Sequence, residues 1–336
     1  MNTTARAIVY PPKLRRGDLL RVIAPSRSRA MVNEHDHTAV IDARFADLGL
    51  RLSYGEHVDE RDEFDSSSVS SRVADLHAAF ADPDVAGVLT VIGGHNSNEL
   101  LPFLDWDLIA ANPKVFCGYS DITALQNAIL ARTGLVTYSG PHWSSFGMRE
   151  HFGQTQDWFA AMVLESDPVE LAASPTWTDD VWFLDQNRRT VLDTDGWWPL
   201  APGRATGRVI GTNLCTLNLL QGTPYMPSLD GALLMLEDDY RSDPHEFARD
   251  LTSLLALPDA AGVRGLVIGR FQQASGLTRP MLEHIVGNPA NRRVLAGLPV
   301  LANVDFGHTN PQATVPIGGQ ARLEVSARPT LTLIEH

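Results

Sequence analysis

Cysteine and long apolar runs are scarce in this sequence. Of its 336 residues only Cys117 and Cys215 are cysteines, and both lie in apolar segments, where a free thiol usually packs as a small core residue. We therefore expect no disulfide. No segment approaches the ~20 apolar residues that span a bilayer, and the N-terminal residues hold no apolar run long enough for a signal-peptide core. The pattern predicts a cytoplasmic protein without a membrane partner.

Positive charge is also scarce. The chain has 27 Lys and Arg residues against 40 Asp and Glu, which gives a formal net charge of −13, and it has no stripe of clustered basic residues. Such a balance repels polyanions and argues against a nucleic acid polymer as the partner. A small molecule or a short peptide is the partner that this charge favours.

The length and the apolar content favour two domains, because 336 residues that are 44% hydrophobic can bury one large core or two ordinary ones. From residue 19 to about residue 137, short apolar runs alternate with helical periodicity, which is typical of βα units and a parallel sheet. Helices are predicted at 68–81, 97–104 and 121–132. Strand patterns return after residue 203, and the closing runs ARLEVSA and TLTLIEH predict an antiparallel pair.

A tryptophan-rich stretch separates the two regions. Between Pro168 and Pro202 the chain is rich in Trp, Asp and Pro and has little regular periodicity, as in a linker or a loop over a site. We therefore expect an N-terminal domain at 1–165, a linker or substrate loop at 166–204 and a C-terminal domain at 205–336. Packing and ligand contact are equal alternatives for the tryptophans, because large aromatic side chains mostly serve packing.

Reactive groups in a parallel α/β sheet collect at the carboxyl ends of the strands. Gly93 and Gly94 follow an apolar run, and their amides can serve a developing oxyanion, although a plain turn before a helix cap is the alternative. Ser120 stands at a sharp turn from strand to helix, which suits a nucleophile. Ile122 replaces the second glycine of the pattern G-x-S-x-G, so a helix-cap serine is an equal alternative.

Glu237 in LLMLEDDY and His308 in ANVDFGHTNP also follow apolar runs. Taken singly, Glu237 has the alternative of being the first solvated residue after a strand, and His308 that of a hydrogen-bonded loop histidine. Together with Ser120 they supply an orienting acid, a general base and a nucleophile, which are the three parts that acyl transfer requires.

The histidines of NEHDH, His35 and His37, are a weak metal signal. No partner carboxylate stands at helical spacing from them, so a solvated loop is the preferred interpretation. We expect neither a metal nor a cofactor.

Taken together, the motifs resemble the LD-carboxypeptidase family of serine peptidases, which includes the microcin C immunity relatives. The matching segments are PPKLRRGDLLRVIAPS, IGGHNSNELLPFLD, FCGYSDITAL, GTNLCTLNLLQGTPYMP, LLMLEDDY, GLVIGRF and FGHTNPQATVPIG. The tryptophan-rich stretch and NLCTLNLLQGT resemble the microcin-immunity branch more than the peptidoglycan-recycling branch. Two departures, His95 after the paired glycines and Thr212 where GGN is typical, bear on substrate preference.

The resemblance implies a fold and a set of roles. The fold is α/β, with an N-terminal parallel-sheet, Rossmann-like domain of the class I glutamine-amidotransferase type and a C-terminal swivelling-type α/β domain. Ser120 is then the nucleophile, His308 the general base and Glu237 its orienting acid, while the backbone amides of Gly94 and Asp121 form the oxyanion hole. A homodimer is also expected.

The implied substrate is an amide near a free carboxyl terminus, or an aminoacyl-nucleotide joined through an acyl-sulfamate or phosphoramidate. We select Trp182 as an aromatic platform under an adenine-like ring, with Trp177 second and Asn213 as a further substrate-binding residue. One alternative is an L,D-carboxypeptidase of peptidoglycan recycling. Another is a non-catalytic binding module, which would be expected to lose at least one member of the Ser, Glu and His set.

Overall fold

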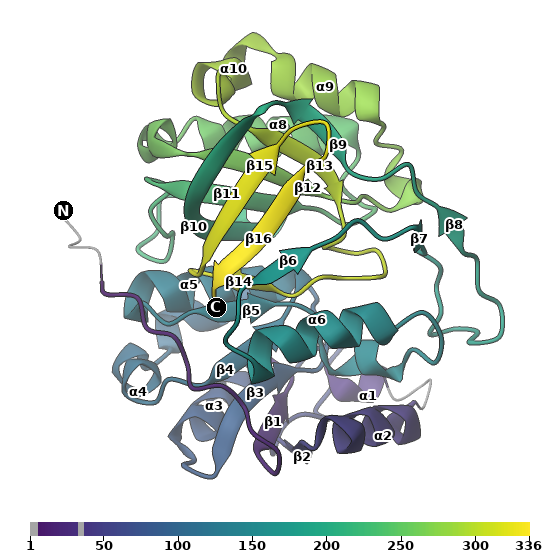
Figure 1. The fold of residues 1–336 in the computed structure, drawn as a ribbon. Helices are drawn as coiled ribbons and strands as arrows, with labels where there is room; N and C mark the ends of the chain where they lie inside the picture. The colour runs from purple at the N-terminus through teal and green to yellow at the C-terminus, as the bar shows by residue number, and fades with distance from the viewer. Residues whose placement is uncertain (1–5, 33–36) are drawn as a thin grey trace.

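The computed structural model describes residues 6–32 and 37–336, which form a mixed α/β structure (Figure 1). The first sheet has six strands in the order β14-β5-β4-β3-β1-β2. Neighbouring pairs among β1 to β5 are parallel, and β14 runs antiparallel to β5. The strands are β1 (Leu19–Ile23), β2 (Arg51–Tyr54), β3 (Val85–Thr90), β4 (Val115–Gly118), β5 (Thr137–Ser139) and β14 (Val315–Ile317).

Helices and short 3-10 turns connect these strands. The α-helices are α1 (Arg29–Val32), α2 (Thr38–Leu48), α3 (Val69–Ala81), α4 (Trp106–Ala111), α5 (Thr123–Thr133) and α6 (Gly153–Leu164). The 3-10 turns are η1 (Ser97–Phe103), η2 (Ser120–Ile122) and η3 (Trp143–Gly147). The helices predicted at 68–81 and 121–132 are confirmed as α3 and α5. The segment predicted as a helix at 97–104 is η1 instead, and it contains Pro102, which cannot donate a helical hydrogen bond.

The second sheet has eight strands in the order β6-β16-β15-β10-β11-β12-β13-β9. Its central strands β10 to β13 are parallel, and the flanking strands β15, β16, β6 and β9 are antiparallel to their neighbours. The strands are β6 (Val169–Leu171), β9 (Trp198–Ala201), β10 (Gly203–Asn213), β11 (Ala232–Glu237), β12 (Gly265–Gly269), β13 (Val300–Val304), β15 (Gln320–Val325) and β16 (Thr330–Glu335). The predicted antiparallel pair at the end of the chain is confirmed as β15 and β16.

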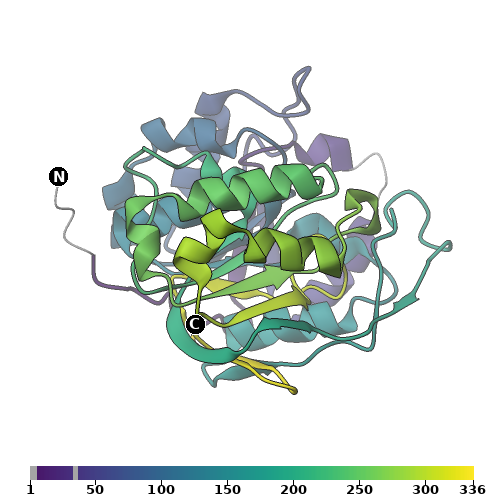
Figure 2. The same cartoon turned by 90° about the horizontal axis from the view of Figure 1, so that it is seen from above.

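A group of helices lies over the second sheet when the molecule is viewed from above (Figure 2). Its members are α7 (Leu214–Asn218), α8 (Pro244–Leu255), α9 (Arg279–Gly287) and α10 (Pro289–Leu295), with the 3-10 turns η4 (Pro258–Gly262) and η5 (Gln273–Ser275). All residues of β11, β12 and β13 are buried, as expected for parallel strands that are covered on both faces. The predicted α/β fold class is confirmed. No helix in the described ranges is long and apolar enough to cross a membrane.

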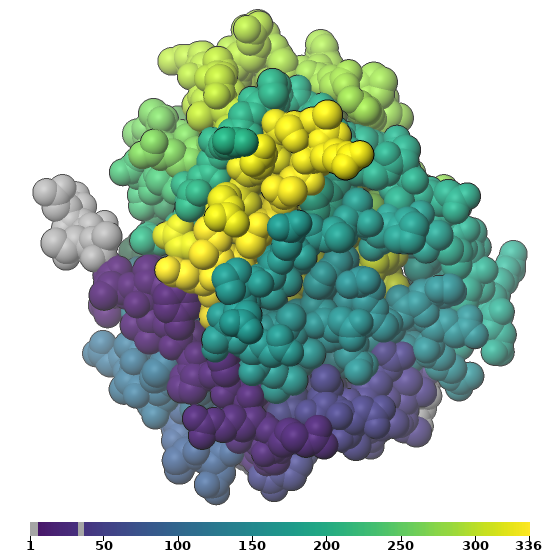
Figure 3. Space-filling view, viewed as in Figure 1, coloured from purple at the N-terminus to yellow at the C-terminus, as the bar shows by residue number. Residues whose placement is uncertain are grey.

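The tryptophan-rich region and the C-terminal region both contribute short strands to the sheets. The tryptophan-rich region contributes β6 and β9 to opposite edges of the second sheet, and its β7 (Thr176–Trp177) and β8 (Leu192–Asp193) form a separate pair. From the C-terminal region, β14 returns to pair with β5 in the first sheet. In the space-filling view the yellow C-terminal strands lie against teal residues of the middle of the chain (Figure 3). The C-terminal region therefore contributes a strand to the first sheet as well as strands to the second.

Candidate active site

Ser120 lies at a sharp turn between β4 and α5. Its φ of 65° falls in the left-handed region, which few residues other than glycine adopt and which is often found at functional sites. The turn depends on small neighbours. A Cβ at Gly118 would lie 2.1 Å from Thr90 Oγ1, and a Cβ at Gly93 would lie 2.9 Å from Ser120 Cβ. The N-cap residues of η2 and α5 are Tyr119 and Ile122, so Ser120 is not the helix cap.

The side chains of Ser120, His308 and Glu237 form a hydrogen-bonded chain. Ser120 Oγ is 3.0 Å from His308 Nε2, and His308 Nδ1 is 2.6 Å from Glu237 Oε2. Because a carboxylate only accepts hydrogen bonds, the imidazole proton belongs on Nδ1 and leaves Nε2 free to accept from the serine hydroxyl. The arrangement is that of a nucleophile, a general base and a group that orients the base.

Glu237 ends β11 and is buried, with a relative exposure of 1%. Two glycines make room for its side chain. A Cβ at Gly269 would lie 2.8 Å from Glu237 Cβ, and a Cβ at Gly307, whose φ is 101°, would lie 2.7 Å from Glu237 Oε2. Any larger residue at either position would displace the acid from His308.

Acidic neighbours set the protonation of His308. Burial lowers the pKa of His308, but the charge and hydrogen bond of Glu237, with the charges of Asp239 and Asp238, raise it above its usual range overall. Burial and the nearby charge of Glu237 also raise the pKa of Asp238 to about 6. The cluster therefore favours the imidazolium that forms when His308 takes a proton from the serine.

Two aromatic residues that sequence reasoning missed pack beside the imidazole. The rings of Tyr119 and His308 meet edge to face with centroids 5.2 Å apart, and His142 stacks on Tyr119 at 4.5 Å. Burial and the charge of His308 lower the pKa of His142 to about 3, so His142 is neutral. The position of Tyr119 next to Ser120 was the available signal, but nothing in the local sequence points to His142.

The carboxylate of Asp121 connects the loop that carries Gly94 to the turn that carries Ser120. Asp121 Oδ2 accepts hydrogen bonds from Ser26 Oγ at 2.7 Å and from the Ser97 amide at 2.9 Å. A Cβ at Gly94 would lie 2.2 Å from Ser26 Oγ, so the loop that carries Gly94 passes directly over this network. Sequence reasoning assigned Asp121 a role for its amide and missed that of its side chain.

The predicted substrate residues lie in three different settings. Asn213 is buried; its Oδ1 caps α7 by accepting from the Thr216 amide at 3.2 Å, and its Nδ2 donates to Asp238 Oδ1 at 3.2 Å. Trp182 is half-buried between β7 and β8, with its ring centroid 5.6 Å from that of His37. Trp177, in β7, is also half-buried.

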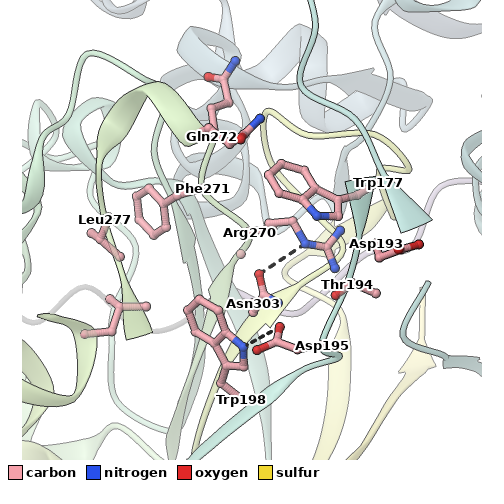
Figure 4. A pocket seen from close by; sticks show the side chains of 13 residues that line it. Trp177, Asp193, Thr194, Asp195, Trp198, Arg270, Phe271, Gln272, Leu277 and Asn303 are labelled. Carbon is pink, nitrogen blue, oxygen red and sulfur yellow. Dashed lines mark hydrogen bonds between the residues drawn. The ribbon is translucent and has the colours of Figure 1, made fainter. Parts of the chain in front are cut away.

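Trp177 lines a cavity of about 230 Å³, where its ring lies over the Arg270 guanidinium at 5.4 Å (Figure 4). Arg270 Nε donates to Asn303 Oδ1 at 3.2 Å on the wall of the cavity. Gly269 lines the same cavity and also packs against Glu237. The cavity is therefore adjacent to the acid of the Ser–His–Glu chain.

Within residues 6–32 and 37–336, no group of three or more His, Cys, Asp and Glu side chains could hold a metal ion. His35 lies outside the described residues, and His37 Nε2 is 3.3 Å from the carbonyl oxygen of Phe183. Both cysteines are free: Cys117 is buried and Cys215 is exposed.

Comparisons with known proteins address the family directly. Residues 20–140 match the model of the LD-carboxypeptidase N-terminal domain, and residues 206–323 match that of the C-terminal domain. The chain is 47% identical over 318 residues to the putative carboxypeptidase YocD of Bacillus subtilis (strain 168), covering 94% of this chain and 96% of that protein.

Solved structures of high similarity share the whole fold. A crystal structure of an MccF-like protein from Bacillus anthracis str. Ames has a TM-score of 0.94 and 45% identity, covering 98% of this chain and 100% of that chain. A structure of MccF in complex with glutamyl sulfamoyl guanosine has a TM-score of 0.84 and 28% identity, covering 97% and 98% of the two chains. The chain therefore belongs to the LD-carboxypeptidase family of serine peptidases and is a carboxypeptidase-type hydrolase.

Proposed function

We propose that this protein hydrolyses the amide bond of peptidyl- or aminoacyl-nucleotides of the microcin C type through a Ser–His–Glu triad and an acyl-enzyme. The observation that carries the proposal is the continuous hydrogen-bonded chain from Ser120 through His308 to Glu237. A serine nucleophile, a general base and a buried acid that orients the base are the groups that acyl transfer requires.

In the first half of the reaction, His308 Nε2 takes the Ser120 proton as Oγ attacks the carbonyl carbon of the substrate. The amides of Gly94 and Asp121 donate to the oxyanion of the tetrahedral intermediate; losing one such donor typically raises the barrier by about 3 to 4 kcal/mol. The C–N bond then breaks, and His308 returns the proton to the leaving amine.

In the second half, His308 takes a proton from a water molecule as the water attacks the acyl-enzyme. The C–Oγ bond breaks, the carboxylic acid leaves, and the proton returns to Ser120. Glu237 keeps the imidazole in its working tautomer throughout and stabilises the imidazolium.

The substrate class rests on the MccF structure, which carries glutamyl sulfamoyl guanosine, and on the aromatic residues of the tryptophan-rich segment. Trp182 is preferred over Trp177 as the platform for a nucleobase. The Arg270 guanidinium already lies over the Trp177 ring, whereas Trp182 is half-exposed on the loop between β7 and β8. Asn213 remains a proposed substrate-binding residue; its side chain caps α7 and donates to Asp238.

An L,D-carboxypeptidase acting on muropeptides is the second candidate, since the matched family models carry that name. The same triad would serve either substrate, so only the substrate pockets distinguish the two. Incubating the protein with an aminoacyl-sulfamoyl adenosine and, separately, with an L,D-tetrapeptide, followed by mass spectrometry, decides between them. Cleavage of the tetrapeptide alone would rule out the nucleotide substrate.

The nucleobase platform has its own test. Base-aromatic stacking contributes about 1 to 3 kcal/mol, so Trp182→Ala should lower kcat/KM for the adenylate substrate roughly ten- to a hundredfold. A dipeptide without a base should be cut as before. Trp182→Phe, which keeps an aromatic face, is the matched control and should retain most of the activity. Equal losses on both substrates would make Trp182 a packing residue.

We further propose that the protein acts as a cytoplasmic homodimer, with functional division at residues 1–165, 166–204 and 205–336. Sedimentation equilibrium tests the assembly, and cell fractionation tests the location. Limited proteolysis tests the division, with cleavage expected first within 166–204.

A further inference from the structure

A cluster of arginines lines a second cavity, far along the strands from the catalytic acid. Arg204, Arg208 and Arg264 surround a cavity of about 510 Å³. Gly231 and Pro299 also line it, and they directly precede β11 and β13. Glu237 stands at the other end of β11, so the cavity lies at the amino ends of the parallel strands.

The strand register brings two of these arginines side by side. Arg208 of β10 pairs with Ala232 of β11, and Leu233 pairs with Gly265 of β12. Arg264 continues that register beside Ala232, and its amide donates to the Ala232 carbonyl oxygen at 2.8 Å. With strands about 4.8 Å apart, the two arginine backbones are about 9.6 Å apart on one face. Ala232 stands between them in the register.

The charge of these arginines is only partly compensated: Tyr10, which donates to Glu335 Oε2 at 2.9 Å, lies within electrostatic range of Arg208. Arg204 pairs with Glu324 at 2.7 Å in an exposed ion pair. Neither Arg208 nor Arg264 has an ion-pair partner among residues 6–32 and 37–336, and Arg208 Nε is a buried donor without a hydrogen-bond partner there. Asp230 is the acidic residue on the cavity wall, and its carboxylate packs against Gly262. A local positive excess therefore stands out on a chain with a net charge of −13.

We propose that this cavity binds a small molecule that carries two or more phosphate groups, with Arg208 and Arg264 each holding one of them. A guanidinium presents a planar fork of donors that matches phosphate oxygens, and the spacing across Ala232 suits linked phosphates rather than a single ion. A cavity of 510 Å³ has the size of a small-molecule site, and the net charge of −13 opposes a nucleic acid polymer. The site is separate from the triad and from the proposed nucleotide platform.

Calorimetric titration with inorganic tripolyphosphate tests the site. We expect saturable binding that weakens with added salt. The double variant Arg208→Gln/Arg264→Gln should lose at least about tenfold in affinity, since each substitution removes charge-assisted hydrogen bonds. Arg328→Gln removes the same charge from an exposed turn outside the cavity and should bind within about twofold of the wild type. Equal losses in the control, or no saturable binding to the wild type, would overturn the proposal.

Three further measurements sharpen the result. The double variant should keep its thermal midpoint and its kcat/KM on the dipeptide substrate. Unchanged values would show that the fold and the triad are intact. Citrate should compete poorly with tripolyphosphate, and equal competition would refute the phosphate preference. A changed sedimentation coefficient in the double variant would make the cavity an interface between copies of the chain and would also overturn the proposal.

Discussion

Replacing Glu237 with glutamine is the sharpest test of the catalytic chain. The amide has almost the volume of the carboxylate, so it fits between Gly269 and Gly307 without opening a cavity. The amide can donate to His308 Nδ1, which favours the tautomer with its proton on Nε2, facing Ser120. In that tautomer the imidazole cannot accept the serine proton. An equivalent change in another Ser–His–acid triad lowers kcat about 10⁴-fold, and we expect a loss of that order here.

The same variant should shift the pH profile. His308 acts as a base only when neutral, so its raised pKa places the acid limb of kcat/KM above the position of an ordinary histidine. Removing the Glu237 charge leaves burial as the main influence on the His308 pKa, and the acid limb should move to lower pH. Stopped assays from acid to alkaline pH, with kcat/KM fitted at each point, measure both effects.

Asp239→Asn is the matched control. Asp239 raises the pKa of His308 by its charge alone, and by less than Glu237 does, so its loss should shift the acid limb less and spare most of kcat. A Glu237→Gln variant that keeps more than about a tenth of its activity, or whose acid limb moves to higher pH, would refute the assignment of Glu237 as the orienting acid.

Other substitutions test the remaining parts. Ser120→Ala should abolish turnover, and adding His308→Ala should lower activity no further, because both act in one unit; kinetics of the single and double variants check this. Gly118→Ala should destabilise the fold by about 1 to 3 kcal/mol in urea unfolding, because its Cβ would meet Thr90 Oγ1, and Thr90→Ala should restore most of the loss. Arg270→Leu leaves the buried carboxylate of Asp305 without its charged partner. The free energy of unfolding should fall by about 3 to 5 kcal/mol, measured by the thermal midpoint and by urea unfolding.

The strand ends were predictable because their signal is local. Apolar runs mark β4 and β11, and the groups that follow them in parallel sheets gather at one edge. Ser120 and Glu237 were identified in this way, as was His308 in the loop after β13. The resemblance then assigned their roles. Such residues are recognisable from the local sequence, because each stands where an apolar run ends.

The contacts across the sheets were not predictable from local patterns. Ser120 follows a strand of the first sheet, whereas Glu237 ends a strand of the second, and no periodicity encodes how two sheets face each other. The short strands β6 and β14 were missed for the same reason: each has three residues and is stabilised by a partner far away in the chain. The stacking of His142 on Tyr119 likewise depends on two loops meeting in space.

Thr212, noted in the sequence as a departure from the family pattern, has a position that bears on triad geometry. Its hydroxyl is buried at the end of β10, 2.8 Å from Ser139 Oγ of β5 and 3.3 Å from Thr123 Oγ1 of α5. The hydroxyl therefore joins the second sheet to the first. Because Ser120 belongs to the first sheet and Glu237 to the second, the 3.0 Å contact between Ser120 and His308 depends on how firmly the sheets are held together. A glycine at 212 would remove this link, so the departure affects the alignment of nucleophile and base as well as substrate preference.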